Sequence, residues 1–298
     1  MLRSMYTGIS GMKSFQTKLD VVSNNIANVN TFGFKKGRLT FSDLMSQTMQ
    51  GATAPVNADG GPVRGGQNPM QVGLGSSTGT IDNIHTQGNR QMTNRPLDLS
   101  IEGDGMFVVA EKLANGDADT IQLDQDNISF TRAGNFYLDN DGYIVNASGQ
   151  YLVGSTGDAG NEVASRIQIP ETAQSFSIGG NGNVDFIDEN GNRVTAGEIR
   201  LAKFSNPEGL QKAGGNLYKL TGNAGVVTDG ADFNDVADLY TPQTNGVGGI
   251  FAGSLEMSNV DLSEEFTEMI TAQRGFQANT RVITTSDEIL QELVNLKR

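Results

Sequence analysis

A single histidine, His85 in "TIDNIHTQG", is the one imidazole that this 298-residue chain offers for acid–base chemistry. A Ser-His-Asp or Cys-His arrangement would have to use it. The alternating pattern around it, however, is more typical of an ordinary strand residue. The chain has no cysteine, so a zinc site with several His or Cys ligands is excluded by composition.

Two segments have the glycine and acidic residues of a calcium loop: "YLDNDGY" (137–143) and "FIDENGN" (186–192). An EF-hand loop begins with an acidic ligand and needs a glutamate six residues after its glycine. Tyr137 and Phe186 occupy the first ligand position, and Ser148 and Gly197 occupy the position of the glutamate. We therefore interpret both segments as hairpin turns and predict no metal site.

The remaining patterns of catalytic residues are weak. "EGDGMF" (102–107) is rich in glycine, but the Lys-Ser/Thr of a phosphate loop does not follow it. The 34 acidic residues leave a paired-carboxylate glycosidase open, although no pair stands out and the chain has no tryptophan to stack on a sugar. We expect no cofactor and no enzymatic activity, with a glycosidase and a surface binding module as remote alternatives.

Both ends of the chain show a heptad-like spacing that predicts helices packed along their length. The first runs through residues 1–32 and the second through 256–298, where Asp261 or Ser263 is positioned to cap the helix. Polar residues interrupt both series, which favours a specific register or partner. The predicted packing residues are Leu2, Met5, Ile9, Met12, Leu19 and Ile26 in the first helix, and Leu262, Phe266, Met269, Gln273, Phe276, Ile283, Leu290 and Val294 in the second. An intramolecular helical hairpin and helices that order only among copies of the chain are both compatible with this spacing.

Charge is distributed unevenly along the chain. Residues 1–40 carry a net charge of +5 and residues 256–298 one of −4, while the whole chain carries −13. An acidic chain argues against general nucleic-acid binding. The sequence shows no run of 18 apolar residues, which argues against membrane insertion, and no pattern of a cleaved secretion signal.

The middle of the chain has the short alternating runs and turn dipeptides of a β structure. Examples are "LDLSIEGDGMFVV" (97–109) and "EIRLAKF" (198–204), with a turn at Asp104 and Gly105. Residues 51–75 show neither helical nor strand periodicity and are rich in Gly and Pro. We predict a mostly β body with long N- and C-terminal α-helices that pair as a coiled coil. Its parts are a helical domain of residues 1–32 and 256–298, an extended connector of residues 33–75 and a β-rich body of residues 76–255.

Several motifs resemble those of the bacterial flagellar axial proteins, the family of rod, hook and hook-associated subunits. "NNIANVNTFGFKK" (24–36) is similar to the N-terminal signature of that family, and residues 255–298, with "SNVDL", "AQR-FQAN" and "NLKR", to its C-terminal signature. "RPLDLSIEGDGMFVV" (95–109) and "FTRAGNFYLDNDGYIVNASGQYLVG" (130–154) are similar to its body motifs.

The resemblance implies a structural subunit that assembles into a helical tube, with the terminal helices lining the inside and the β body forming the outer wall. It implies export through the flagellar type III apparatus without a cleaved signal, and a location in the flagellar hook or basal body. The implied partners are other copies of the chain, the adjoining rod and hook–filament junction proteins, and a hook cap during assembly.

As a hypothesis, Asn24, Asn25 and Asn28 bond to neighbouring copies, and Phe32 and Phe34 anchor a turn that Gly33 makes possible. "QVGLGSSTGTIDNIHTQG" (71–88) looks most like a hook protein of Bacillus-type bacteria, whereas "IQIPETAQSFSIGGNGNV" (167–184) is also similar to the distal rod. On these patterns we favour the hook, with the distal rod as the alternative.

Overall fold

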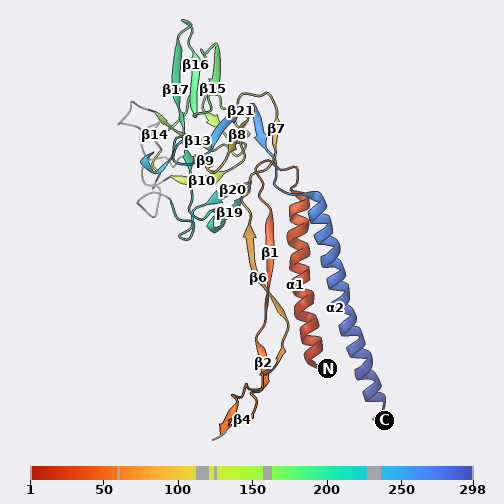
Figure 1. Cartoon of the computed structure of the whole chain (residues 1–298). Helices are drawn as coiled ribbons and strands as arrows, with labels where there is room; N and C mark the ends of the chain where they lie inside the picture. The colour runs from red at the N-terminus through yellow and green to blue at the C-terminus, as the bar shows by residue number, and fades with distance from the viewer. Residues whose placement is uncertain are drawn as a thin grey trace. The chain divides into compact units, whose positions relative to one another are not determined.

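The structure is a computed structural model that describes residues 2–58, 61–111, 121–123, 126–156, 163–226 and 236–296. The chain divides into two compact units (Figure 1). The helical unit comprises Met1–Ala27, Gly37–Asn83 and Asp261–Arg298, and the body unit comprises Asn28–Lys36 and Ile84–Val260. The boundaries at residues 32, 75 and 255 that the sequence indicates stay a prediction.

Two long antiparallel helices form the core of the helical unit: α1 (Leu2–Ala27) and α2 (Leu262–Leu296). Asp261 caps α2, because its Oδ1 accepts a hydrogen bond of 2.8 Å from the Ser263 N–H. Glu264 and Glu265 lie in the first turn, where the helix dipole favours negative charge. A helix at each end of the chain and the cap at Asp261 are thus confirmed. Neither helix carries, among the described residues, a stretch apolar enough to span a bilayer.

The rest of the helical unit is a long antiparallel ribbon of paired strands. Its strands are β1 (Gly37–Asp43), β2 (Ser46–Gln50), β3 (Val56–Ala58), β4 (Gly61–Arg64), β5 (Met70–Gly73) and β6 (Ser76–Asn83). Strand β1 pairs with β6, β2 with β5, and β3 with β4. The range predicted as an extended connector thus contains strands that the sequence did not indicate. Strands β2 and β5 are exposed on both faces, so they have no buried side that would make apolar and polar residues alternate.

The body unit is built around one large sheet, and its β-rich character is confirmed. The sheet runs in the order β15-β16-β17-β13-β9-β10-β20-β19, with β11, β12, β14 and β18 attached, while β8 pairs with β21 and β7 with β22. The strands are β7 (Arg90–Met92), β8 (Leu99–Glu102), β9 (Met106–Glu111), β10 (Asn127–Thr131), β11 (Tyr137–Leu138), β12 (Ile144–Val145), β13 (Tyr151–Thr156), β14 (Val163–Arg166), β15 (Ser175–Ile178), β16 (Asn183–Ile187), β17 (Arg193–Ile199), β18 (Leu201–Ala202), β19 (Gln211–Gly214), β20 (Leu217–Lys219), β21 (Gly249–Ala252) and β22 (Ser254–Glu256). Two single 3₁₀ turns lie at Pro207–Gly209 and Val236–Asp238.

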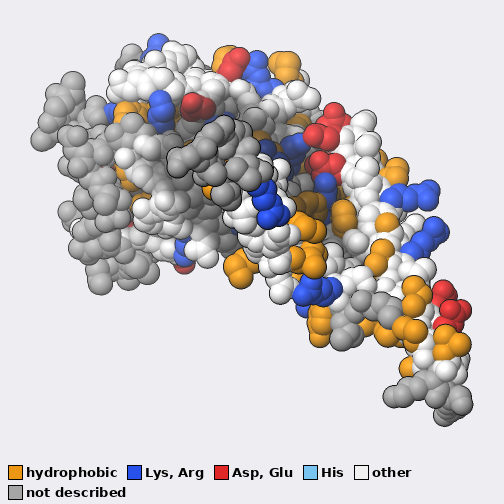
Figure 2. All heavy atoms as spheres, turned by 60° about the horizontal axis from the view of Figure 1, so that its bottom comes forward, with side chains coloured by type: hydrophobic (Ala, Val, Ile, Leu, Met, Phe, Trp, Pro, Cys, Tyr) orange, Lys and Arg blue, Asp and Glu red, His pale blue; other side chains and the backbone are white. Residues whose placement is uncertain are grey.

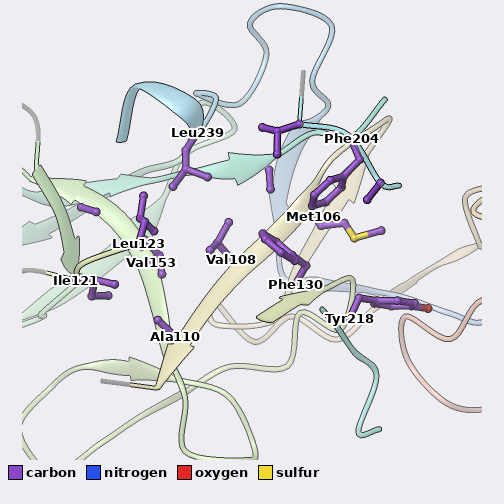
Figure 3. Packing of buried hydrophobic residues seen from close by; sticks show 14 of the residues in the cluster. Met106, Val108, Ala110, Ile121, Leu123, Phe130, Val153, Phe204, Tyr218 and Leu239 are labelled. Atoms are coloured by element: carbon purple, nitrogen blue, oxygen red, sulfur yellow. The ribbon is translucent and has the colours of Figure 1, made fainter. Parts of the chain in front are cut away.

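Strand β9 is covered on both of its faces. Met106, Val108 and Ala110 belong to one buried cluster, which Figure 3 shows, and Phe107 and Val109 belong to a second one. Successive side chains of a strand point to opposite faces, so this alternation places β9 between two layers of the core. The uninterrupted apolar run in "GMFVVA" is therefore the signature of a strand with no solvent-facing side.

Only some of the turns that the sequence indicates connect two strands that pair with each other as a hairpin. The two calcium-like segments are hairpin turns as predicted, because β11 pairs with β12 and β16 pairs with β17. Asp104 and Gly105 do turn the chain between β8 and β9, but these two strands do not pair with each other. Strand β8 pairs with β21, whereas β9 pairs with β10, β13 and β18. This turn therefore transfers the chain from one sheet to another.

Candidate subunit-packing site

Glycines and polar side chains take part in the contact between α1 and α2. A Cβ added at Gly275 would lie 2.5 Å from the ring of Phe15, so a side chain at this position would force the ring or the helices to shift. A Cβ at Gly11 would lie 2.8 Å from the amide of Asn279. Each glycine inside a helix costs about 1 kcal/mol relative to alanine, which this close approach offsets.

Polar contacts extend along the same pair of helices. The hydroxyls of Ser4 and Ser286 lie 3.3 Å apart. Further along, Lys18 Nζ lies 3.3 Å from Glu268 Oε2, in a partly exposed ion pair. Exposed pairs of this kind contribute about 0–1 kcal/mol, so the pair contributes more to the register of the helices than to their stability.

Asn25 joins α1 to both α2 and the ribbon. Its Nδ2 donates to the Gly37 carbonyl at 2.8 Å and to Glu265 Oε2 at 3.1 Å, and its Oδ1 accepts from the Gly37 N–H at 3.0 Å. Both Asn25 and Glu265 are buried. The amide thus pairs with Gly37 as a neighbouring peptide group would, and it donates a further hydrogen bond to a buried carboxylate.

The other asparagines of the N-terminal motif are placed differently. Asn24 is exposed on α1. Asn28 lies beyond the end of α1 in the body unit, where its Oδ1 accepts a hydrogen bond of 3.1 Å from the Thr31 hydroxyl. We predicted that these asparagines face other copies of the chain, but the structure uses the amide of Asn25 within the chain itself.

The predicted packing residues fall into two groups. Leu2 lies in α1, but its side chain is outside the described residues. The partly buried group consists of Met5, Met12, Leu19, Ile26, Met269, Phe276, Ile283 and Leu290. The exposed group consists of Ile9, Leu262, Phe266, Gln273 and Val294. These residues stay a prediction for contacts between subunits.

Large apolar side chains are exposed along α2. Phe266 is 50% exposed, Ile270 58% and Val294 64%, although such residues are usually buried. In the space-filling view of Figure 2, hydrophobic side chains reach the surface among charged ones. We call this set the exposed apolar residues of α2: Leu262, Phe266, Ile270, Val282, Ile289, Leu293, Val294 and Leu296. An exposed apolar set of this size is typical of a surface that packs against another protein.

Sequence reasoning missed several residues of the contact between α1 and α2, although the predicted Ile283 lies in it, 3.1 Å from a Cβ added at Gly8. The predicted series followed large side chains, whereas Gly11, Phe15, Gly275 and Asn279 lie in the contact. The signal that was available is the recurrence of glycine inside two otherwise regular helices, since glycine there is unfavourable unless a close approach requires it.

Gly33 and Phe34 position the chain at the start of the body unit. Gly33 has φ +68°, and a Cβ there would lie 2.5 Å from the Ala133 nitrogen. Its N–H donates to the Glu256 carbonyl at 2.8 Å. The Phe34 ring is buried beneath Lys212 Nζ, which lies 4.8 Å from the ring centroid, while Phe32 is half-buried.

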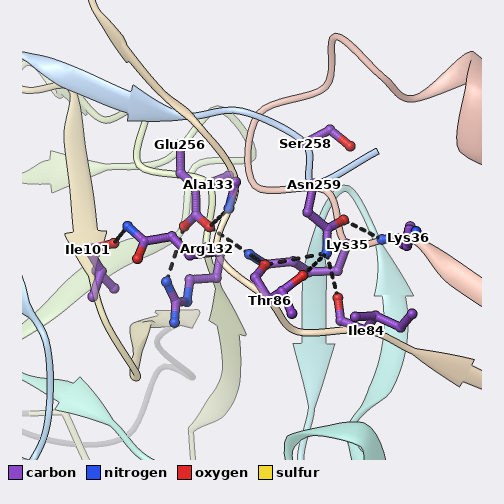
Figure 4. A network of polar contacts seen from close by, with 12 residues as sticks. Lys35, Lys36, Ile84, Thr86, Ile101, Arg132, Ala133, Glu256, Ser258 and Asn259 are labelled. Carbon is purple, nitrogen blue, oxygen red and sulfur yellow. Dashed lines mark hydrogen bonds and ion pairs between the residues drawn. The ribbon is translucent and has the colours of Figure 1, made fainter. Parts of the chain in front are cut away.

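A buried ionic cluster lies next to this turn (Figure 4). Lys35 Nζ lies 2.6 Å from Glu256 Oε1, and Arg132 Nη1 lies 3.1 Å from Glu256 Oε2. All three residues are buried, with Lys35 fully so. Burial lowers the pKa of Lys35, and the nearby Glu256 carboxylate opposes this effect. Sequence reasoning gave no role to these three residues, although each lies in or beside a quoted motif.

Asn259 continues the polar contacts beside the cluster (Figure 4). Its Oδ1 accepts from the Lys36 N–H at 2.8 Å, and its Nδ2 donates to the Ile84 carbonyl at 2.8 Å. One asparagine side chain thus holds together segments of the body unit that are far apart in the sequence.

His85 does not lie in a strand, which corrects the expectation from its alternating surroundings. It follows β6 in an irregular segment, where its ring lies 5.5 Å from that of Tyr218. Burial, reinforced by Lys35, Arg132 and Lys212, lowers the pKa of His85 to about 4. Burial also raises the pKa of Tyr218 to about 12. Both side chains are therefore neutral at pH 7.

Comparison with known protein families gives matches in the N-terminal, central and C-terminal parts of the chain. Residues 5–35 match the flagella basal body rod protein family. Residues 100–186 match the D1 domain of the flagellar hook proteins FlgE/F/G, and residues 252–296 match the C-terminal region of the flagellar basal body rod FlgEFG proteins.

Similar proteins match over the whole chain. It is 51% identical to the flagellar basal-body rod protein FlgG of Bacillus subtilis, with both chains fully covered. It is 36% identical to the FlgG of Caulobacter vibrioides, over 99% of this chain and all of that protein. The flagellar hook protein FlgE of Borreliella burgdorferi is 30% identical, again with both chains fully covered.

These matches favour the rod over the hook, although the sequence patterns had favoured the hook. Hook and rod proteins share the same domains, so patterns from these domains do not separate the two. Because its relatives match over their full length and its terminal and body regions match the corresponding families, the chain belongs to the flagellar rod and hook protein family, whose members are structural components of the flagellum.

Proposed function

We propose that this protein is the distal rod subunit of the bacterial flagellum, which assembles with copies of itself into a stiff tube. The observation that carries self-assembly is the set of exposed apolar residues of α2, in which Phe266 is 50% and Ile270 58% exposed. Burial of apolar surface stabilises an assembly by about 25 cal/mol per Å² removed from water, so exposed apolar residues of this kind favour association. The tube needs one surface that meets a different surface on the next copy, so that the assembly does not close into a ring.

The choice of rod over hook rests on two observations. The first is the 51% identity to a rod protein over the full length of both chains. The second is the paired ribbon of β1 to β6, because an antiparallel ladder bends less readily than the unpaired connector expected from the sequence. A drive shaft must resist bending, whereas a hook must allow it.

In this proposal α1 and α2 form a coiled coil that contributes to the inner tube, and the body unit contributes to the outer wall. Its partners are other copies of the chain and the adjoining rod and hook proteins. Its location is the basal body of the flagellum, reached through the flagellar export apparatus.

The test is negative-stain electron microscopy of the full-length protein, concentrated in a salt such as ammonium sulfate that strengthens apolar burial. We expect straight, stiff tubes. A Phe266→Ser/Ile270→Ser variant should stay monomeric, whereas Met92→Ser, which removes a 78% exposed apolar side chain from β7, should form tubes like the original protein. Curved tubes would support the hook instead, and a protein that stays monomeric at all concentrations would contradict self-assembly.

A further inference from the structure

A cavity of about 220 Å³ lies in the body unit next to His85. Its charged and titratable lining residues are His85, Asp104, Arg132 and Lys203. A water molecule occupies about 30 Å³ in the liquid, so the cavity has room for a small solute together with several waters.

Buried hydrogen-bonding atoms of two lining residues have no partner among the described residues. Arg132 uses Nη1 for Glu256 and Nη2 for the Gly103 carbonyl, at 3.1 and 2.7 Å, while its Nε is buried and unpaired. Both ring nitrogens of His85 are likewise buried and unpaired. Buried polar atoms are nearly always hydrogen-bonded, so the Arg132 Nε–H and the one N–H of the neutral His85 ring favour an acceptor supplied by solvent or by a ligand, whereas the other ring nitrogen is itself an acceptor.

Positive charge is in excess around this cavity. Lys203 Nζ donates only to backbone carbonyls, those of Asn245 at 3.1 Å and Gly246 at 3.4 Å, and no carboxylate pairs with it among the described residues. Burial is the main cause that lowers the pKa of His85, and the charges of Lys35, Arg132 and Lys212 lower it further, so three cations act on this ring. The carboxylates of this region are Glu256, which Lys35 and Arg132 share, and Asp104, which is exposed. Such an excess is notable in a chain with a net charge of −13.

We propose that this cavity binds a small tetrahedral oxyanion of the phosphate or sulfate class, held by Arg132 Nε, Lys203 Nζ and one ring N–H of His85. Each Nη of Arg132 already makes one hydrogen bond within the chain, which leaves the Nε–H as the buried donor of this guanidinium that has no partner among the described residues. Single donors from three residues fit a tetrahedral anion, which has a separate oxygen for each of them.

The experiment uses His85 as its own reporter, because the chain has one histidine. The full-length protein is labelled with ¹³C,¹⁵N-histidine and kept dilute, and inorganic phosphate is added at constant ionic strength and pH 7.5 while the ring signals are followed by NMR. We expect a shift that saturates with phosphate concentration. Lys203→Gln should weaken binding about tenfold, since it removes a charged donor, and Lys203→Arg should restore most of the affinity. The control Lys219→Gln removes an equal charge from an exposed position outside the cavity lining and should bind as the original protein does.

Two results would overturn the proposal. The first is a ring signal that does not move, or moves without saturating, as phosphate is added to the original protein. The second is an equal change of affinity in Lys203→Gln and Lys219→Gln, which would reflect general charge screening and not a site. A parallel titration with acetate tests the class of ligand, because tighter saturation by acetate than by phosphate contradicts a tetrahedral preference.

Discussion

The amide of Asn25 donates a hydrogen bond of 3.1 Å to the carboxylate of Glu265, and both side chains are buried within the helical unit. The same amide holds both backbone polar groups of Gly37. A single side chain therefore connects α1, α2 and the first residue of β1.

Asn25→Ala should destabilise the helical unit, because it removes these contacts and leaves buried polar groups without a partner. The expected loss is about 1–3 kcal/mol of unfolding free energy, measured by urea denaturation followed through helical circular dichroism. Asn24→Ala, at an exposed neighbouring position, should change the stability by no more than about 0.5 kcal/mol. Equal effects of the two variants would show that the Asn25 contacts contribute nothing.

Glu256→Ala should be among the most damaging single changes in the body unit. It leaves Lys35 and Arg132 buried without a counter-charge, and breaking a buried ion pair in this way costs about 3–5 kcal/mol. The control is Glu102→Ala, which removes a half-exposed carboxylate from its pair with Arg90 and should cost at most about 1 kcal/mol. Thermal unfolding of both variants measures the difference, and similar melting temperatures would contradict the prediction.

The stability of the body unit should fall between pH 6.5 and pH 4 because of His85. Its pKa is about 4 in the folded protein and near 6.5 when unfolded, so below pH 6.5 the unfolded chain takes up a proton that the folded protein does not. Above pH 6.5 neutral His85 makes its full contribution to the free energy of unfolding. About 3 kcal/mol of this contribution is lost when the pH falls to 4. Urea denaturation at pH 7.5, 5.5 and 4.5 tests this against a His85→Gln variant, whose stability should depend less steeply on pH. An identical slope in both proteins would exclude His85 as the cause.

Gly33→Ala should destabilise the body unit by about 3 kcal/mol, because the new Cβ meets backbone atoms of Ala133 and the residue has a positive φ. Gly149→Ala separates the two causes. Gly149 has φ +80° but no atom within 4 Å of an added Cβ, so only the backbone strain remains, at about 1 kcal/mol. If chemical denaturation gives equal losses for the two variants, the contact with Ala133 has no energetic effect.

The sequence predicts those elements whose periodicity reflects burial on one side. The terminal helices and many strands of the body are of this kind, whereas β9 was indicated by an uninterrupted apolar run and the cap at Asp261 by its residue type. The ribbon of β1 to β6 is not, because β2 and β5 have two exposed faces and their residues need not alternate.

The candidate site was harder to predict, for two physical reasons. The register of α1 against α2 depends on glycines such as Gly11 and Gly275, whereas a search for periodicity follows large side chains. The sequence gives no sign that Lys35, Arg132 and Glu256 are buried, because charged residues ordinarily lie at the surface. Their burial depends on ion pairs that form only in the folded structure.

The glycines between α1 and α2 also let α2 pack closely against α1 while large apolar side chains of α2 stay exposed. These exposed apolar residues of α2 stay available for contacts outside the chain. We expect substitutions among these residues to leave the contact between α1 and α2 unchanged, so that the pitch, diameter or partners of an assembly can evolve while the helical hairpin is kept.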